Sequence, residues 1–250
     1  MADIKTEESY AEHKDTSKEV GIALVSNNFD NALDYAEIGL DAFVSDEILK
    51  EIPIVKTVVG VVKSGLKVKE IFFTKKILTF LKEFHSGKLP KDKFDKFQEE
   101  FTTDEKYRAK VMEQIMVFND TFLQIEKSKV FANLFAAHLN EAYGWDDFVN
   151  LSFCLNQLNM YGVSLFDDMA EFKTPFYGAL YDDAKHRHPL LNNSGTISIW
   201  GNHLDITSYG LYMYHYGIKG KVDEDIRGAY PAIFKSKEEM AKEGKSLEQQ

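Results

Sequence analysis

Apolar residues recur every three or four positions through most of residues 54–162, and this spacing constrains the fold more than any other feature. Val111, Ile115, Phe118 and Phe122, for instance, would share one face of a helix. An apolar helix face is stabilised by packing against other apolar faces. The sequence therefore predicts a mainly α protein with a multi-helix body, with helical spacing at 45–52, 54–66, 71–84, 94–101, 105–125, 130–143 and 146–162.

The pattern changes near the C-terminus. After short helical stretches expected at 165–172 and 176–183, the runs 195–200 and 203–207 are rich in strand-forming residues and flank Gly201-Asn202, a two-residue turn signal. Helical spacing returns at 208–216. This order of helices, hairpin and short helix resembles the end of a winged helix. We therefore expect a small C-terminal winged-helix-like unit carrying one β-hairpin.

Composition divides the chain into four expected parts. Residues 1–25 are polar and weakly patterned, which predicts a flexible N-terminal segment, and residues 26–162 form the helical body. Residues 163–218 form the winged-helix-like unit. Gly, Lys and Glu dominate residues 219–250, which predicts a mobile tail.

The sequence favours a cytoplasmic location. Cys154 is the single cysteine, so the chain can form neither an intramolecular disulfide nor a cysteine zinc cluster. The acidic N-terminus lacks the basic start and apolar stretch of a secretory signal. The basic helical stretch 54–84 contains no uninterrupted apolar run of about 18 residues, so it does not predict a spanning helix.

Charge is distributed unevenly. The net charge is -10 and only Arg108, Arg187 and Arg227 are arginines, which disfavours nucleic acid as a partner. Nine lysines but only three glutamates lie between Lys50 and Lys88, a local charge of +6 (9 − 3) in an otherwise acidic chain.

This basic segment is the first candidate binding surface. Basic amphipathic helices dock on anionic membranes or on acidic partners, although most amphipathic helices simply pack into a core. The sequence leaves both readings open for helices 54–84. The partner-binding or membrane-binding candidates are Lys56, Lys63, Lys67, Lys75 and Lys76.

The hairpin region supplies a second candidate surface, formed by Trp200, His203 and Tyr209. Aromatic platforms of this kind stack nucleobases in single-strand binders. Basic residues are not interleaved with these aromatics, so a packed hairpin is the favoured interpretation.

Motifs for chemistry are weak. His186 and His188, close to Asp182 and Asp183, are weak metal-ligand candidates, and a solvated loop is favoured over a metal site. The acidic pairs 146–147 and 167–168 favour capping and dipole roles at helix starts over catalysis. Nucleophile, phosphate-loop and dinucleotide motifs are missing from the sequence. We therefore expect no enzyme activity, no metal and no cofactor.

Four short segments resemble a dispersed set of uncharacterised bacterial and phage proteins, in an order that extends from about Ile52 to Tyr216. The segments are Ile52-Pro-Ile-Val-Lys56, Ile71-Phe-Phe-Thr-Lys-Lys-Ile77, Lys127-Ser-Lys-Val130 and Phe148-Val-Asn-Leu-Ser152. The resemblance implies a helical body with a winged-helix-like end and assigns no functional residues.

The sequence thus predicts a non-enzymatic interaction or regulatory protein that binds a protein partner, in a phage or defence context. One alternative is a membrane-surface effector acting through helices 54–84. A second alternative is a weak winged-helix DNA binder. The sequence leaves assembly into a homo-oligomer open.

Overall fold

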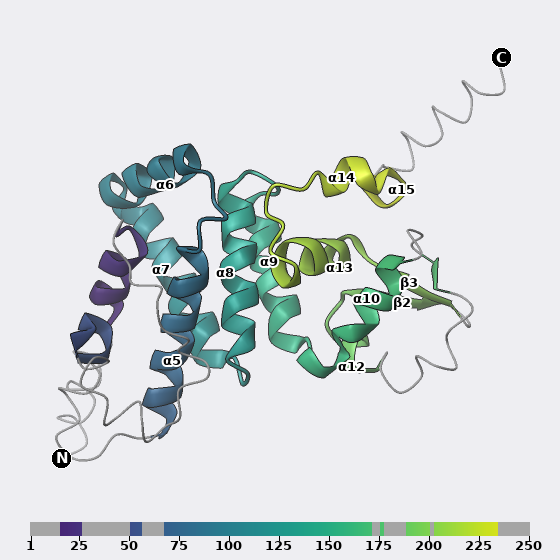
Figure 1. The fold of residues 1–250 in the computed structure, drawn as a ribbon, viewed down its shortest axis with the longest axis horizontal. Helices are drawn as coiled ribbons and strands as arrows, with labels where there is room; N and C mark the ends of the chain where they lie inside the picture. Colours follow the sequence, from purple (N-terminus) through teal and green to yellow (C-terminus); the bar gives the residue numbers. More distant parts are fainter. Residues whose placement is uncertain are drawn as a thin grey trace.

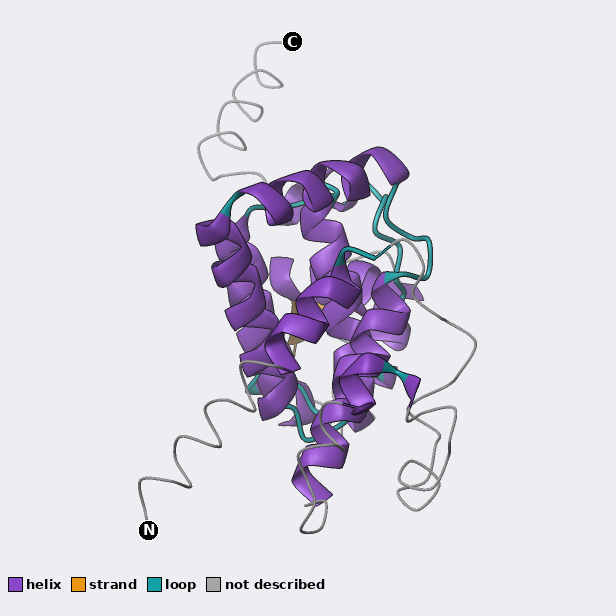
Figure 2. Cartoon of the chain, turned by 90° about the vertical axis from the view of Figure 1, so that its left-hand side faces the viewer, coloured by secondary structure: helices purple, strands orange, loops and turns teal. Residues whose placement is uncertain are grey.

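The computed structural model describes residues 16–26, 51–56, 68–171, 176–177, 189–200 and 203–234. Most of this described chain is helical. Figure 2 shows helices in nearly every part of the view, with the small sheet visible only in part behind them.

The body is built from four long helices that alternate in direction. They are α5 (Val68–Phe84), α7 (Glu105–Thr121), α8 (Glu126–Leu139) and α9 (Trp145–Gln157). The shorter α6 (Lys91–Thr103) lies across their upper end in Figure 1. Short connections between successive long helices are typical of antiparallel neighbours in a bundle.

Helix α8 lies at the centre of the body. It packs against α5 and α9 on one side and against the C-terminal region on the other, and nearly every residue from Lys127 to Ala137 is buried. The fully buried ring of Phe131 contacts the rings of Phe80, Phe118, Phe122 and Phe148 at centroid distances of 5.4–5.8 Å. Aromatic contacts of this kind contribute beyond their burial alone.

Local capping sets the start of α7. The Asp104 side chain accepts hydrogen bonds from the backbone N–H groups of Lys106 and Tyr107, which satisfies donors that the helix itself leaves open. Asp104 is therefore the N-cap of α7. Thr102 instead donates to the Gln98 carbonyl within α6.

Short elements follow the bundle. The helical ones are η1 (Met160–Gly162), α10 (Ser164–Glu171), α12 (Pro189–Asn192), α13 (Ser208–Tyr212), the π-helix η2 (Met213–Ile218), α14 (Ile226–Ala229) and α15 (Pro231–Phe234). The strands are β1 (Phe176–Tyr177), β2 (Ile197–Trp200) and β3 (His203–Ile206). They form one antiparallel sheet in the order β1-β3-β2, with Phe176 opposite Asp205 and Ile199 opposite Leu204.

The structure confirms a mainly helical protein with an antiparallel hairpin near the C-terminus. One expected helix is wrong in its described part, because Phe176 and Tyr177 form β1 rather than opening a helix at 176–183. Pairing with the edge of β3 supplies hydrogen bonds that local helical spacing cannot anticipate. The resemblance to a winged helix is not confirmed.

The expected boundaries differ from the structure at both ends. Within the predicted flexible segment, residues 16–24 form a helix in which Val20 and Leu24 are fully buried. Within the predicted tail, Val222 and Ile226 are buried, and the Asn140 side chain of the bundle donates to the Val222 carbonyl at 3.0 Å. Burial of these apolar side chains holds both segments against the bundle, and the hydrogen bond to Val222 adds to this in the C-terminal one. Their polar composition alone had predicted mobility.

A single hydrophobic core runs through the described residues. Buried side chains from Val20 to Ile226 form one cluster, so the bundle shares its core with the residues expected to make a separate unit at 163–218. Helix η2 makes much of this connection by packing along α8.

Close approach of η2 to α8 depends on Gly217. A Cβ atom at this position would lie 2.8 Å from Val130 Cγ1 and 3.3 Å from Leu134 Cδ2. The Asn133 side chain also donates to the Gly217 carbonyl at 2.9 Å. A larger residue would therefore push η2 away from α8.

We expect Gly217→Ala to lower the free energy of unfolding by about 1–3 kcal/mol, because the added methyl group overpacks this contact. Urea unfolding followed by circular dichroism measures the change. In a Val130→Ala background, which removes the nearest methyl group, the same substitution should cost less. An equal loss of unfolding free energy in both backgrounds would show that the contact between Gly217 and Val130 does not limit how closely η2 packs on α8.

Tyrosines anchor η2 to its surroundings. Tyr143 of the bundle is buried, and its hydroxyl donates to the Leu134 carbonyl at 2.7 Å. The Tyr216 hydroxyl donates to the Glu224 carbonyl at 2.8 Å. Burial raises the pKa of Tyr143 well above its ordinary value and raises the pKa of Tyr216 to about 12.

A raised tyrosine pKa contributes stability that is complete below pH 10 and is lost as the pH rises through the folded-state value. Between about pH 10 and pH 12 the unfolding temperature should therefore fall. The fall should be shallower in Tyr216→Phe, with Tyr161→Phe at an exposed position as the control. Thermal melts at several pH values between about 10 and 12 measure the fall. If the unfolding temperature decreased equally with pH in Tyr216→Phe and in the unmodified protein, the prediction would be wrong.

Candidate interaction surface

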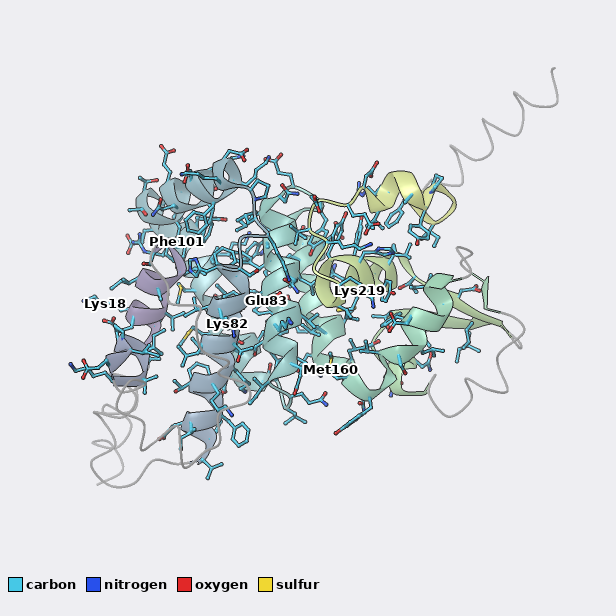
Figure 3. The ribbon with its side chains drawn as sticks, in the orientation of Figure 1. Lys18, Lys82, Glu83, Phe101, Met160 and Lys219 are labelled. Carbon is cyan, nitrogen blue, oxygen red and sulfur yellow. The ribbon has the colours of Figure 1, made fainter. Side chains whose placement is uncertain are left out.

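The lower end of the bundle is organised by two buried lysines. The C-terminal ends of α7 and α9 meet the start of α8 there, and Met160, which follows α9, marks this end in Figure 3. The side chains of Lys76 and Lys127 are both only 5% exposed. Buried ammonium groups need compensating partners.

Both lysines find these partners at helix C-termini. The Lys76 ammonium donates to the carbonyls of Asp120 and Phe122, at 3.0 and 2.8 Å, where α7 ends. The Lys127 ammonium donates to the Asn156 carbonyl at 2.8 Å, in the last turn of α9. Carbonyls at a helix C-terminus lack partners within the helix and carry partial negative charge, so they suit a cation.

Burial lowers the pKa of Lys76, while the nearby Asp120 carboxylate acts in the opposite direction. Burial likewise lowers the pKa of Lys127. The carbonyl contacts therefore offset part of a desolvation cost. They also fix where α7 and α9 end.

Large apolar side chains are exposed at the same end. Leu123, in the turn after α7, is 95% exposed, and Tyr161 in η1 is 81% exposed. Phe153 in α9 is 59% exposed and Val117 in α7 is 51% exposed. We call these four residues the apolar end.

The described contacts connect sequence neighbours of the residues in the apolar end. The Phe153 ring lies edge-on to Phe118, the neighbour of Val117, at 5.2 Å. The backbone N–H of Met160 contacts the Gln124 side-chain oxygen at 3.4 Å, which joins the residues beside Tyr161 and Leu123. Exposed apolar residues that gather in this way, rather than scatter singly, indicate a binding surface.

Charges of both signs border the apolar end. Lys69 in the first turn of α5 lies 3.5 Å from the Asp120 carboxylate, and both side chains are largely exposed. Glu126 is exposed at the start of α8. Among the described residues, this border therefore carries charges of both signs.

The basic candidates predicted from the sequence do not form one surface. The sequence left open whether Lys75 and Lys76 lie on a docking surface or in a packed helix. Both are buried, because α5 is a core helix whose residues from Thr74 to Leu81 are all buried. Burial lowers the pKa of Lys75, and Glu126 opposes this shift. Lys56 is exposed. Lys63 and Lys67 lie outside the described residues.

The aromatic candidates lie on three elements, β2, β3 and α13. Tyr209 is half-buried and packs on α9, where its hydroxyl donates to Asp147 at 3.1 Å and accepts from the Asn150 amide at 3.0 Å. Trp200 ends β2 and His203 begins β3, directly opposite one another in the register. Tyr209 thus connects the sheet region to the bundle.

The acidic pairs 146–147 and 167–168 lie at the starts of helices. Asp147 lies in the first turn of α9 and Asp167 in the first turn of α10, as expected for carboxylates at helix starts. Asp167 also accepts from Tyr214 and pairs with Lys219, which lowers its pKa. His186, His188 and the pair 182–183 lie outside the described residues. Within the part of the chain that is described, no group of three metal-ligating side chains occurs.

Sequence reasoning missed the apolar end and the role of Lys127. The available signal was that Leu123 and Phe153 do not fit the helical spacing of the core residues around them. The meeting of α7, α9 and η1 at one end required the tertiary structure.

Comparisons with known proteins add no functional residues. No family model, no curated protein and no solved structure matches this chain. Among the helices of the described ranges, none is both long and apolar enough to cross a membrane.

We expect Lys76→Met to lower the free energy of unfolding by about 2 kcal/mol, because it leaves the buried Phe122 carbonyl without its donor. Lys69→Met removes a lysine from the same helix at an exposed site and should change it by less than about 0.5 kcal/mol. Urea unfolding of both variants measures the difference. Equal small effects would mean that the Lys76 contacts contribute little net stability.

Proposed function

We propose that this protein is an interaction protein that binds a protein partner through the apolar end of its helical body. The observation that carries the proposal is the exposure of Val117, Leu123, Phe153 and Tyr161 on elements that contact one another through Phe118 and Phe153 and through Gln124 and Met160. Leu123 in particular is nearly fully exposed. Aromatic and aliphatic anchors with a polar border are typical of protein interfaces.

The mixed border favours a protein over a membrane as the partner. Helices that lie on anionic membranes carry lysine and arginine on the polar face beside their apolar residues. Lys69 is instead paired with Asp120, and Glu126 adds a further negative charge. A matching protein surface with charges of both signs satisfies such a border.

Rigidity also supports a role in recognition. Lys76 and Lys127 hold the ends of the two helices that carry Val117 and Phe153. A preformed surface loses less conformational entropy on binding than a mobile one. The α5 helix supports the surface from within, since exposing its own apolar face would open the core.

Site-specific photo-crosslinking in cells tests the proposal. A photoreactive phenylalanine analogue at position 123 or 161 should give a discrete crosslinked protein that mass spectrometry identifies. The same analogue at position 22, where Ile22 is 54% exposed on the first helix, is the control. Binding of the identified partner, measured with purified proteins, should weaken by about tenfold or more in Leu123→Asn, the loss expected for an interface anchor.

Two outcomes would contradict the proposal. Equal crosslinking at positions 22, 123 and 161 would indicate non-specific contact. Sedimentation of the purified protein with anionic but not neutral vesicles, abolished by Leu123→Asn, would assign the apolar end to a membrane surface instead.

A further inference from the structure

A separate pocket lies at the opposite, upper end of the bundle. Its volume is about 270 Å³, and it forms where α6, the start of α7, the end of α8 and the start of α9 meet. This volume suits one small molecule and is too small for a folded segment. Its polar lining consists of Lys93, Lys96, Glu100, Tyr107, Lys110, His138 and Glu141, and its apolar lining of Phe97, Leu139 and Trp145.

Two lysines of the pocket converge on one carboxylate. Lys93 Nζ lies 2.8 Å from Glu141 Oε2, and Lys96 Nζ lies 3.1 Å from Glu141 Oε1. The two ammonium groups therefore hold one carboxylate between them, one on each oxygen. An acid group from a small ligand would fit the same pair of donors.

The backbone of Glu141 is unusual for this residue type. Helix α8 ends in a Schellman motif, with Glu141 N–H bonded to the His138 carbonyl and Ala142 N–H bonded to the Ala137 carbonyl. Glu141 occupies the left-handed position of this motif, with φ 65°, and it is the one non-glycine residue with positive φ in the described chain. Glycine is the usual residue there because a Cβ atom is unfavourable. Placing a carboxylate at this point carries a conformational cost, as strained residues at binding sites do.

An aromatic wall completes the pocket. Lys110 Nζ lies 4.3 Å from the centre of the Trp145 ring, and Trp145 lies edge-on to His138 at 5.5 Å. His138 is held by a 3.0 Å hydrogen bond from Nδ1 to the Tyr143 carbonyl, which leaves Nε2 as an acceptor in the neutral ring. Burial lowers the pKa of His138 and so favours this neutral form.

The charge balance favours an anion over a cation. Three lysines and two glutamates line the pocket, and one of those glutamates is already paired with two of the lysines. Lys110 contacts the Trp145 ring and has no carboxylate within 4 Å among the described residues. Displacing the Glu141 carboxylate would leave all three ammonium groups available to a ligand.

We propose that this pocket binds a small planar anion, an aromatic ring that carries a phosphate or a carboxylate. The acid group replaces the Glu141 carboxylate between Lys93 and Lys96, and the ring takes the place of the Lys110 ammonium group on the face of Trp145. Glu141 acts as an internal competitor that occupies the two lysines when the ligand is absent. This site is independent of the apolar end at the other end of the bundle.

Tryptophan fluorescence reports directly on the pocket. The chain has two tryptophans, so Trp200→Phe leaves Trp145 as the single reporter. Adenosine 5′-monophosphate and benzoate test an aromatic phosphate and an aromatic carboxylate. Adenosine supplies the ring without the anion, and inorganic phosphate supplies the anion without the ring. At least one aromatic anion should change Trp145 emission saturably, and each half should bind more weakly than the whole.

Matched variants then test the assigned contacts. Lys93→Met with Lys96→Met should weaken binding of the aromatic anion by at least about tenfold, because two charge-assisted contacts are lost. Lys91→Met is the control, since Lys91 is exposed on the same helix and pairs only with Asp95. Glu141→Gly should bind about tenfold more tightly, because it removes the competitor and relieves the left-handed backbone.

Glu141→Asn provides a second measurement if the glycine loosens the helix end, since asparagine also tolerates this backbone and is uncharged. Far-ultraviolet circular dichroism and urea unfolding confirm that each variant is folded. The proposal is overturned if neither aromatic anion changes Trp145 emission in the unmodified pocket or in Glu141→Gly at up to about 10 mM, well above a millimolar Kd. It is also overturned if the double lysine variant binds as tightly as the Lys91→Met control.

Discussion

Burial of α8 on both sides is the constraint on which the rest of the structure depends. Phe131 and Phe135 are fully buried, and their rings meet aromatic rings from α5 and α9. A different face of the helix, which carries Val130 and Leu134, receives η2 at Gly217. A helix that is apolar on almost every face is stable only when other elements pack on all of those faces. For α8, the C-terminal elements cover the faces that α5 and α9 leave open. The sheet region is consequently joined to the bundle through one core.

The same arrangement makes the two ends of the bundle chemically different. At the lower end, buried lysines satisfy the C-terminal carbonyls of α7 and α9 from inside, which leaves apolar side chains on the outer surface. At the upper end, the lysines of α6 stay near the surface and meet the carboxylate of Glu141. At the lower end, each ammonium group stabilises a helix C-terminus by bonding directly to its carbonyls. Lysine is therefore part of the core at the lower end of the bundle and part of a pocket at the upper end.

The C-terminal region is held by polar contacts whose donors are largely buried. Asn133 and Asn140 of the bundle bond to the carbonyls of Gly217 and Val222, and the Tyr216 hydroxyl bonds to the Glu224 carbonyl. Hydrogen bonds shielded from water are strong and costly to leave unmade. They explain why residues 219–234 are ordered although their composition is polar. They also add to the apolar packing that connects η2 to α8.

The sequence by itself determined the helical body, the hairpin and the acidic helix starts at Asp147 and Asp167, because spacing, turn residues and carboxylate placement are local properties. Only the tertiary structure decided that Lys75 and Lys76 are buried, that Phe176 and Tyr177 pair as a strand, and that the turn after α7 meets the start of η1 through Gln124 and Met160. A lysine on a helix has the same local pattern whether its ammonium reaches water or a neighbouring carbonyl. The partner that satisfies it lies far away in the sequence, 46 residues for Lys76 and Phe122, and only packing brings the two together.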